Sequence, residues 1–171
     1  MGVMKMKLAI FVYCVICNIP VCFFLCLTSS IIGNSTFEAG VLTIALNQIN
    51  WLNMLYNFLI GFTIAMVVGT CVPLTKIGRW FTNLFHVKND TYTGNMPYRL
   101  LATLIITLIY YVAITPALTV FNYLIGVYTT PGQAGLSMLF NLPIMLLVGF
   151  VSSLINDVAA YRVAHMIDAE F

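Results

Sequence analysis

The residues best suited to chemistry are the cysteines. The chain has five, the first four of them within one apolar stretch: Cys14, Cys17, Cys22, Cys26 and Cys71. Cys14 and Cys17 have the spacing of a zinc-binding pair, but a zinc site needs a second pair or histidines at the same depth. The two histidines, His86 and His165, fall outside the apolar runs. We therefore predict no metal and no cofactor, and we interpret the cysteines as small apolar residues facing lipid or neighbouring helices.

Nucleophilic catalysis would require a serine or cysteine with a histidine or carboxylate at the same depth. Ser152 and Ser153 precede Asp157 by about one helical turn, but no base accompanies them. We predict no catalytic residues and expect that the protein is not an enzyme. Asp157, at the inner end of the last apolar run, is interpreted as a solvated carboxylate. The alternative is an ion pair with Arg162 or with a basic residue of the segment 76–99.

Side-chain amides are unusually frequent around the start of the second apolar run: Asn47, Gln48, Asn50, Asn53 and Asn57. Asn18 and Asn122, in the first and third runs, are expected to be able to face the same interior. Amides donate and accept hydrogen bonds without carrying charge, so they suit neutral or zwitterionic solutes.

Small and polar residues recur at every fourth position in the second and last apolar runs, and we call these the small and polar rows: Asn53, Asn57, Gly61, Ala65 and Gly69 in the second run, with Asn141, Gly149 and Ser153 in the last. Small residues along such a row form a groove that lets another helix approach closely. We predict that the second and fourth helices cross at the centre along these rows. The alternative function of the same rows is a path or pocket for a solute.

The composition assigns the chain to the membrane proteins. Of its 171 residues, 61% are hydrophobic and 7% are charged, against roughly 25% charged residues in soluble domains. The net charge of +2 and the absence of a polybasic run argue against nucleic acid as a partner. Long uncharged stretches predict an all-α polytopic protein, a single membrane domain over 1–171, with helices at 8–32, 51–75, 100–125 and 136–157.

The basic residues predict the orientation. They fall in three segments on one side of a four-helix chain: Lys5 and Lys7; Lys76, Arg79, Lys88 and Arg99; and Arg162. By the positive-inside rule that side is cytoplasmic, together with both termini. Trp51 and Trp80 would lie about 43 Å apart on one helix, matching the two interfaces. The second helix is therefore expected to continue past Lys76.

The sequence also predicts an internal duplication, in which one helical hairpin occurs twice, over about 5–85 and about 96–166. The residues 52–57 match 136–141 at a spacing of 84. Pro20 and Pro116 lie inside the first and third runs, which end at Gly33 and Gly126. Because each unit has two helices, both copies have the same orientation, and the predicted repeat is parallel with an axis along the membrane normal.

One resemblance covers nearly the whole chain. The second run has Trp51, Asn57 and Pro73 followed by Lys-Ile-Gly-Arg at 76–79, and the pattern returns at 136–162 with Asp157 in the place of the proline. This arrangement resembles a family of small bacterial inner-membrane proteins known as a domain of unknown function. The resemblance implies a location in the bacterial cytoplasmic membrane and implies no activity and no site residues.

Two functions follow from these observations. The first is a non-enzymatic membrane subunit or accessory protein, which fits the short loops and the lack of charge in mid-membrane. The second is a small transporter or channel for a neutral or zwitterionic solute. Four helices leave little room for a path in one chain, so the second function predicts a homo-oligomer. The expected partners are the lipid bilayer and a further copy or another membrane protein.

Overall fold

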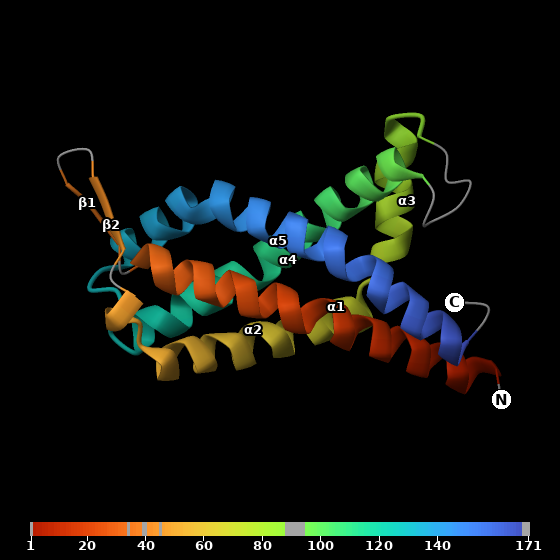
Figure 1. The fold of residues 1–171 in the computed structure, drawn as a ribbon, viewed down its shortest axis with the longest axis horizontal. Helices are drawn as coiled ribbons and strands as arrows, with labels where there is room; N and C mark the ends of the chain where they lie inside the picture. The colour runs from red at the N-terminus through yellow and green to blue at the C-terminus, as the bar shows by residue number, and fades with distance from the viewer. Residues whose placement is uncertain (1, 34, 39–40, 45, 88–94, 169–171) are drawn as a thin grey trace.

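The structure is a bundle of long helices with a short strand pair at one end. The computed structural model of the chain describes residues 2–33, 35–38, 41–44, 46–87 and 95–168. Its elements, shown in Figure 1, are α1 (Gly2–Gly33), β1 (Ser35–Glu38), β2 (Val41–Ile44), a 3-10 turn (Leu46–Gln48), α2 (Trp51–Cys71), α3 (Leu74–Leu84), α4 (Met96–Leu124) and α5 (Pro131–Ile167). The two strands pair antiparallel, with Ser35 opposite Ile44.

Among the described residues, four helices are long and apolar enough to cross a membrane: Lys5–Gly33, Trp51–Cys71, Met96–Leu124 and Pro131–Ile167. The prediction of an all-α polytopic membrane protein with four spanning helices is therefore confirmed. Both chain ends lie at one end of the bundle, and the strand pair lies at the other (Figure 1). We call these the termini end and the hairpin end.

The second spanning helix is shorter than predicted. It ends at Cys71, and Val72 has an extended backbone with φ −91° and ψ 131°. This follows from Pro73, since a proline disfavours the helical conformation of the residue before it. A separate helix, α3, begins at Leu74 and runs across the direction of the long helices (Figure 1).

The expectation that one helix carries both tryptophans is consequently wrong. Trp51 begins α2, whereas Trp80 belongs to α3, and the chain changes direction between them. Their spacing in the sequence is therefore no measure of a distance along one helix. Both side chains are largely uncovered by protein, at 59% and 61% exposure.

The four long helices form a ring in the order α1, α2, α4, α5. The closely packed helix pairs of the described residues are α1 with α2, α2 with α4, α4 with α5 and α5 with α1, together with α3 on α4. The helices α2 and α5 are diagonal in this ring, and the predicted crossing of these two helices along their small and polar rows is wrong. Each helix uses its small residues against α1 and α4 instead.

The glycines of the two rows illustrate this packing. A Cβ atom added to Gly61 would lie 3.5 Å from Ile114 of α4. A Cβ atom on Gly149 would lie 3.1 Å from the Cγ2 of Thr107, also in α4, and 3.6 Å from Leu25 of α1. The absence of side chains here lets α4 and α1 come close to both diagonal helices.

The order of the helices in the ring is compatible with the predicted duplication. If α1 is exchanged with α4 and α2 with α5, every helix keeps the same two neighbours. The two halves differ in their second helix. The helix α2 ends after 21 residues, shortly before Pro73, whereas α5 is one helix of 37 residues. The duplication over 5–85 and 96–166 stays a prediction.

Three prolines lie inside spanning helices. Pro20 and Pro116 do so as the sequence indicates, and Pro143 in α5 is a third. The end of α4 is formed by Gly126, whose φ of +81° favours glycine, and the amide of Val127 donates to the carbonyl of Asn122 across this turn.

The helices α1 and α5 form the most extensive helix pair of the described residues. Three alanines of these two helices are fully buried towards the termini end: Ala9, Ala160 and Ala164. At 1.5 Å per residue, the 37 residues of α5 extend about 55 Å, well beyond a hydrocarbon core of about 30 Å. We call the part of this pair at the termini end, where the three alanines pack, the two-helix stalk.

Candidate functional site

The ring of helices encloses a cavity of about 100 Å³ to which α1, α2, α4 and α5 all contribute side chains. On this measure a single water needs on the order of 10–15 Å³, so the cavity has room for several waters or a small solute. Because Tyr128, in the connection between α4 and α5, lines it, the cavity reaches the hairpin end. It continues inward as far as Ser153 of α5.

An amide cluster joins α2 to α4 at the hairpin end. Asn57 and Asn122 are hydrogen-bonded in both directions, with donor–acceptor distances of 3.3 and 3.0 Å. Asn53 also donates to the Oδ1 of Asn122, at 3.4 Å, and Asn122 donates to the carbonyl of Leu118, at 2.9 Å. Asn57 and Asn122 line the cavity, so this cluster presents amide groups to its interior.

The opposite wall at the same end belongs to α5. Asn141 donates to the hydroxyl of Ser137 at 3.2 Å, and Ser137 and Tyr128 share a hydroxyl–hydroxyl hydrogen bond of 3.2 Å. Asn57 and Asn141, which are related by the spacing of 84, thus line one cavity from diagonal helices.

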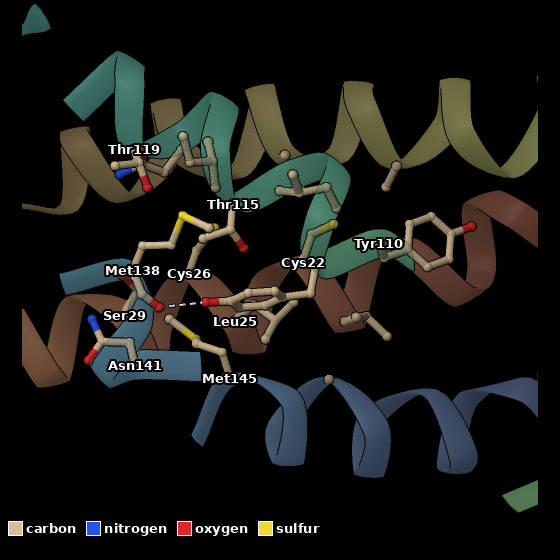
Figure 2. Close-up of a pocket in the computed structure, with 18 of the residues that line it drawn as sticks. Cys22, Leu25, Cys26, Ser29, Tyr110, Thr115, Thr119, Met138, Asn141 and Met145 are labelled. Atoms are coloured by element: carbon tan, nitrogen blue, oxygen red, sulfur yellow. Dashed lines mark hydrogen bonds between the residues drawn. The ribbon is translucent and has the colours of Figure 1, made fainter. Parts of the chain in front are cut away.

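Tyrosine and threonine side chains line the middle of the cavity. Tyr111 of α4 donates to the carbonyl of Met138 in α5 at 2.7 Å, which is the dashed line in Figure 2. Figure 2 shows Thr115 of α4 beside this bond and Thr119 further along the same helix, with Cys22 and Cys26 of α1 nearby. The hydrogen bond fixes α4 against α5 close to the proline inside α5.

The inner part of the cavity has a buried hydroxyl with an unused hydrogen-bonding capacity. Thr107 is 6% exposed and lines the cavity, and its Oγ1 has no hydrogen-bond partner among the described residues. Asn18, 4% exposed, lies on the facing helix, and its amide is 3.9 Å from the sulfur of Met66. Buried polar atoms are nearly always hydrogen-bonded. A water or a polar solute in the cavity would satisfy the Thr107 hydroxyl.

A charged cluster lies one turn beyond the cavity, towards the termini end. Asp157 is 5% exposed; its carboxylate accepts a hydrogen bond from Tyr13 of α1 and lies 3.8 Å from the Nε of Arg99 in α4. Arg99 also donates to the carbonyl of Leu154 at 3.1 Å. The cluster links α1, α4 and α5 on the side of Ser153 that faces the termini end, and there it fills the interior of the bundle with protein side chains.

The sequence interpretation of Asp157 as a solvated carboxylate is therefore wrong. A solvated position is expected for an isolated acid at the end of an apolar run, but Arg99 and Tyr13 compensate the burial of this one. The alternative of a pair with a basic residue of the segment 76–99 is confirmed, since Arg99 belongs to it. Arg162, the other candidate partner, is exposed.

Six of the eight residues of the small and polar rows line the cavity: Asn57, Gly61, Ala65, Asn141, Gly149 and Ser153. The other two lie outside its lining. Asn53 donates to Asn122, and Gly69 packs beside Tyr110 and Cys14, which would lie within 3 Å of an added Cβ atom.

The sequence reasoning missed the contribution of α4, although a signal was present. Every fourth residue of this helix is polar over most of its length: Arg99, Thr103, Thr107, Tyr111, Thr115 and Thr119. The last four of these line the cavity and the first belongs to the charged cluster. Threonine and tyrosine count as weakly polar in hydropathy, so the row does not interrupt the apolar run.

No group of three or more histidine, cysteine or acidic side chains in the described part of the chain could hold a metal ion. The five cysteines are unpaired thiols, with Cys14, Cys22 and Cys26 buried and Cys71 exposed.

Comparisons of the chain with protein-family models, with curated proteins and with solved structures gave no match.

Proposed function

We propose that the chain is a non-enzymatic, multi-pass membrane protein whose cavity binds a small neutral or zwitterionic solute and serves as part of a transport path. The observation that carries this proposal is that the small and polar rows of α2 and α5 line one cavity instead of meeting each other. The glycines of the rows pack closely against α4 and α1, whereas Asn57, Asn141 and Ser153 present polar side chains to the cavity. Amides and hydroxyls without net charge suit a neutral or zwitterionic solute.

A second candidate is the membrane subunit or accessory protein. It is favoured by the small volume of the cavity, about 100 Å³, and by the existing hydrogen bonds of Asn57, Asn122 and Asn141. In that function the polar groups serve to hold the helices together, and a partner protein binds the outer faces of the bundle. A homo-oligomer belongs to either proposal.

The proposed location is the bacterial cytoplasmic membrane, with the termini end in the cytoplasm. The described basic residues lie in α1, α3, the start of α4 and the last turns of α5, and Lys88 lies outside the described residues. These segments precede or follow membrane crossings on the side of the two termini, so the positive-inside rule supports this orientation. Fluorescent and alkaline phosphatase fusions at the C-terminus test it: a fluorescent, phosphatase-inactive pair supports it and the reverse result contradicts it.

Native mass spectrometry of the protein, released from its own membrane in mild detergent, distinguishes the two functions. A small polar solute retained in a defined ratio supports the carrier. A stoichiometric second protein without solute supports the accessory subunit.

The substitution Thr107→Val sharpens this test, because it replaces a hydroxyl that has no protein partner by a methyl group of similar size. We expect solute retention to fall by about tenfold, as for the loss of one buried hydrogen bond of about 1–1.5 kcal/mol, with no loss of thermal stability. The control is Thr63→Val, which alters a threonine of α2 that faces away from the protein and bonds its own helix at Leu59. Equal solute retention by both variants would contradict the proposed site.

A further inference from the structure

Among the described α-helices, α3 is the one that does not run along the bundle, and its connection to α2 and its contacts with α4 fix its position. It follows the end of α2 directly, after Pro73, and it packs against α4. A Cβ atom on Gly78 would lie 3.4 Å from the Cβ of Ala102 in α4, and Thr82 is fully buried, with its hydroxyl bonded to the carbonyl of Arg79. Because Cys71 is the last residue of a spanning helix, α3 lies at the boundary of the hydrocarbon core, across the bundle direction (Figure 1).

The remaining surface of α3 is divided into two faces. At 100° per residue, one side carries polar residues, all of them exposed: Thr75, Lys76, Arg79 and Asn83. The side opposite to it carries Leu74, Ile77, Phe81 and Leu84. The exposed Trp80 falls between the two faces. An amphipathic helix with a basic polar face and a tryptophan at the boundary is the kind that lies in the plane of a membrane interface.

The basic face of α3 has no acidic counterpart in the described residues. Lys76 and Arg79 are one turn apart, and neither takes part in the ion pair that joins Arg99 to Asp157. A phosphate group complements such a pair, since arginine presents a planar fork to two oxygens and lysine adds a compact charge. In the headgroup layer, the phosphate that α3 meets belongs to a lipid.

We propose that α3 lies in the headgroup layer and binds anionic phospholipid through Lys76 and Arg79, with Trp80 at the boundary between headgroups and acyl chains. Each basic side chain near an anionic surface is worth enough to enrich such lipids locally by about fivefold. The proposal concerns the outer face of the bundle and is independent of whether the cavity binds a solute.

Trp80 makes the proposal testable in the complete protein. Since the chain has two tryptophans, Trp51→Phe leaves Trp80 as the single indole reporter. The protein is reconstituted in phosphatidylcholine vesicles that contain brominated phosphatidylglycerol or, at equal mole fraction, brominated phosphatidylcholine. We expect several-fold stronger quenching of Trp80 by the anionic brominated lipid, decreasing as salt is raised. Bromines near the headgroup are expected to quench more than bromines near the end of the acyl chain.

The substitutions Lys76→Gln and Arg79→Gln, combined in the same background, are expected to make quenching by the two lipids equal. The matched control is Arg162→Gln, which removes an exposed charge from α5 and is expected to leave the preference unchanged. Size-exclusion profiles verify that the variants fold. Equal quenching by the two lipids in the chain with native Lys76 and Arg79, or stronger quenching by the deeper bromines, would overturn the proposal without reference to any variant.

Discussion

The two ends of the polar interior are built on different chemistry. Towards the hairpin end, the groups are uncharged: the amides of Asn57 and Asn122 bond to each other, and the amide of Asn141 donates to the hydroxyl of Ser137. Beyond the inner end of the cavity, the groups are charged, with Asp157 between Arg99 and Tyr13. An uncharged group in a membrane can exchange partners with water or solute at small cost, whereas a buried charge must keep its counter-charge. The first end is therefore suited to binding and the second to closure.

The largest effect is expected from Arg99→Leu, which leaves the carboxylate of Asp157 buried without its cation. We expect the free energy of unfolding to fall by about 3–5 kcal/mol, measured by denaturant titration in detergent. Arg162→Leu, an exposed position on α5, is the control and is expected to change it little. The double variant Arg99→Leu, Asp157→Leu should recover much of the loss. If Arg99→Leu and Arg162→Leu were equally stable, the charged end of the interior would not differ from the uncharged end in its contribution to stability.

Gly149→Leu tests the wall that the two ends share. Its Cβ would lie 3.1 Å from Thr107, so the added side chain must displace α4 or fill the cavity. Overpacking of this kind costs about 1–3 kcal/mol, and solute retention should be lost. Gly135→Leu is the matched control on the same helix, because no heavy atom lies within 4 Å of its added Cβ. A stable, solute-retaining Gly149→Leu protein would refute the described wall.

Asn122→Leu is expected to cost about 1 kcal/mol of unfolding free energy, typical of a hydrogen bond between membrane helices. Its partners Asn53 and Asn57 stay close to the cavity, where water replaces the lost bonds. Asn57→Leu should have a similar effect, and the double variant less than the sum, since the two residues share one interaction. A loss as large as that of Arg99→Leu would mean that both ends serve closure.

The smallest effect on stability, close to zero, is expected for Thr107→Val, because its hydroxyl has no partner among the described residues. Thermal unfolding of this variant beside Thr63→Val provides the measurement. A clear loss of stability in Thr107→Val alone would show that the hydroxyl serves the fold and not a bound molecule.

The sequence predicts the membrane class and the four spans well, because uncharged runs of this length have no other stable environment. It also indicates most of the cavity residues of α2 and α5 through their small and polar rows. Hydropathy carries no information on which helices are neighbours, so the sequence does not indicate that the rows face a cavity instead of each other. The sequence does contain a signal for the helix end before Pro73, since a proline disfavours the helical conformation of the residue that precedes it.

The charged cluster is a different case. Arg99 and Asp157 are far apart in the chain, and each lies near the end of an apolar run, where a solvated side chain is the ordinary expectation. Only the packing of α1, α4 and α5 brings Tyr13 to the same point. The polar row of α4 was detectable by its fourfold spacing, but threonine and tyrosine do not lower the hydropathy of a helix enough to draw attention to it.

The two-helix stalk of α1 and α5 has a practical consequence for handling the protein. The first and last described residues leave the bundle near the tip of this stalk (Figure 1), where alanine packing holds the two helices together. Dyes placed near the first and last described residues would lie close to each other, one on each helix of the stalk. Energy transfer between such dyes would report separation of α1 from α5 while leaving the lipid-facing surface untouched.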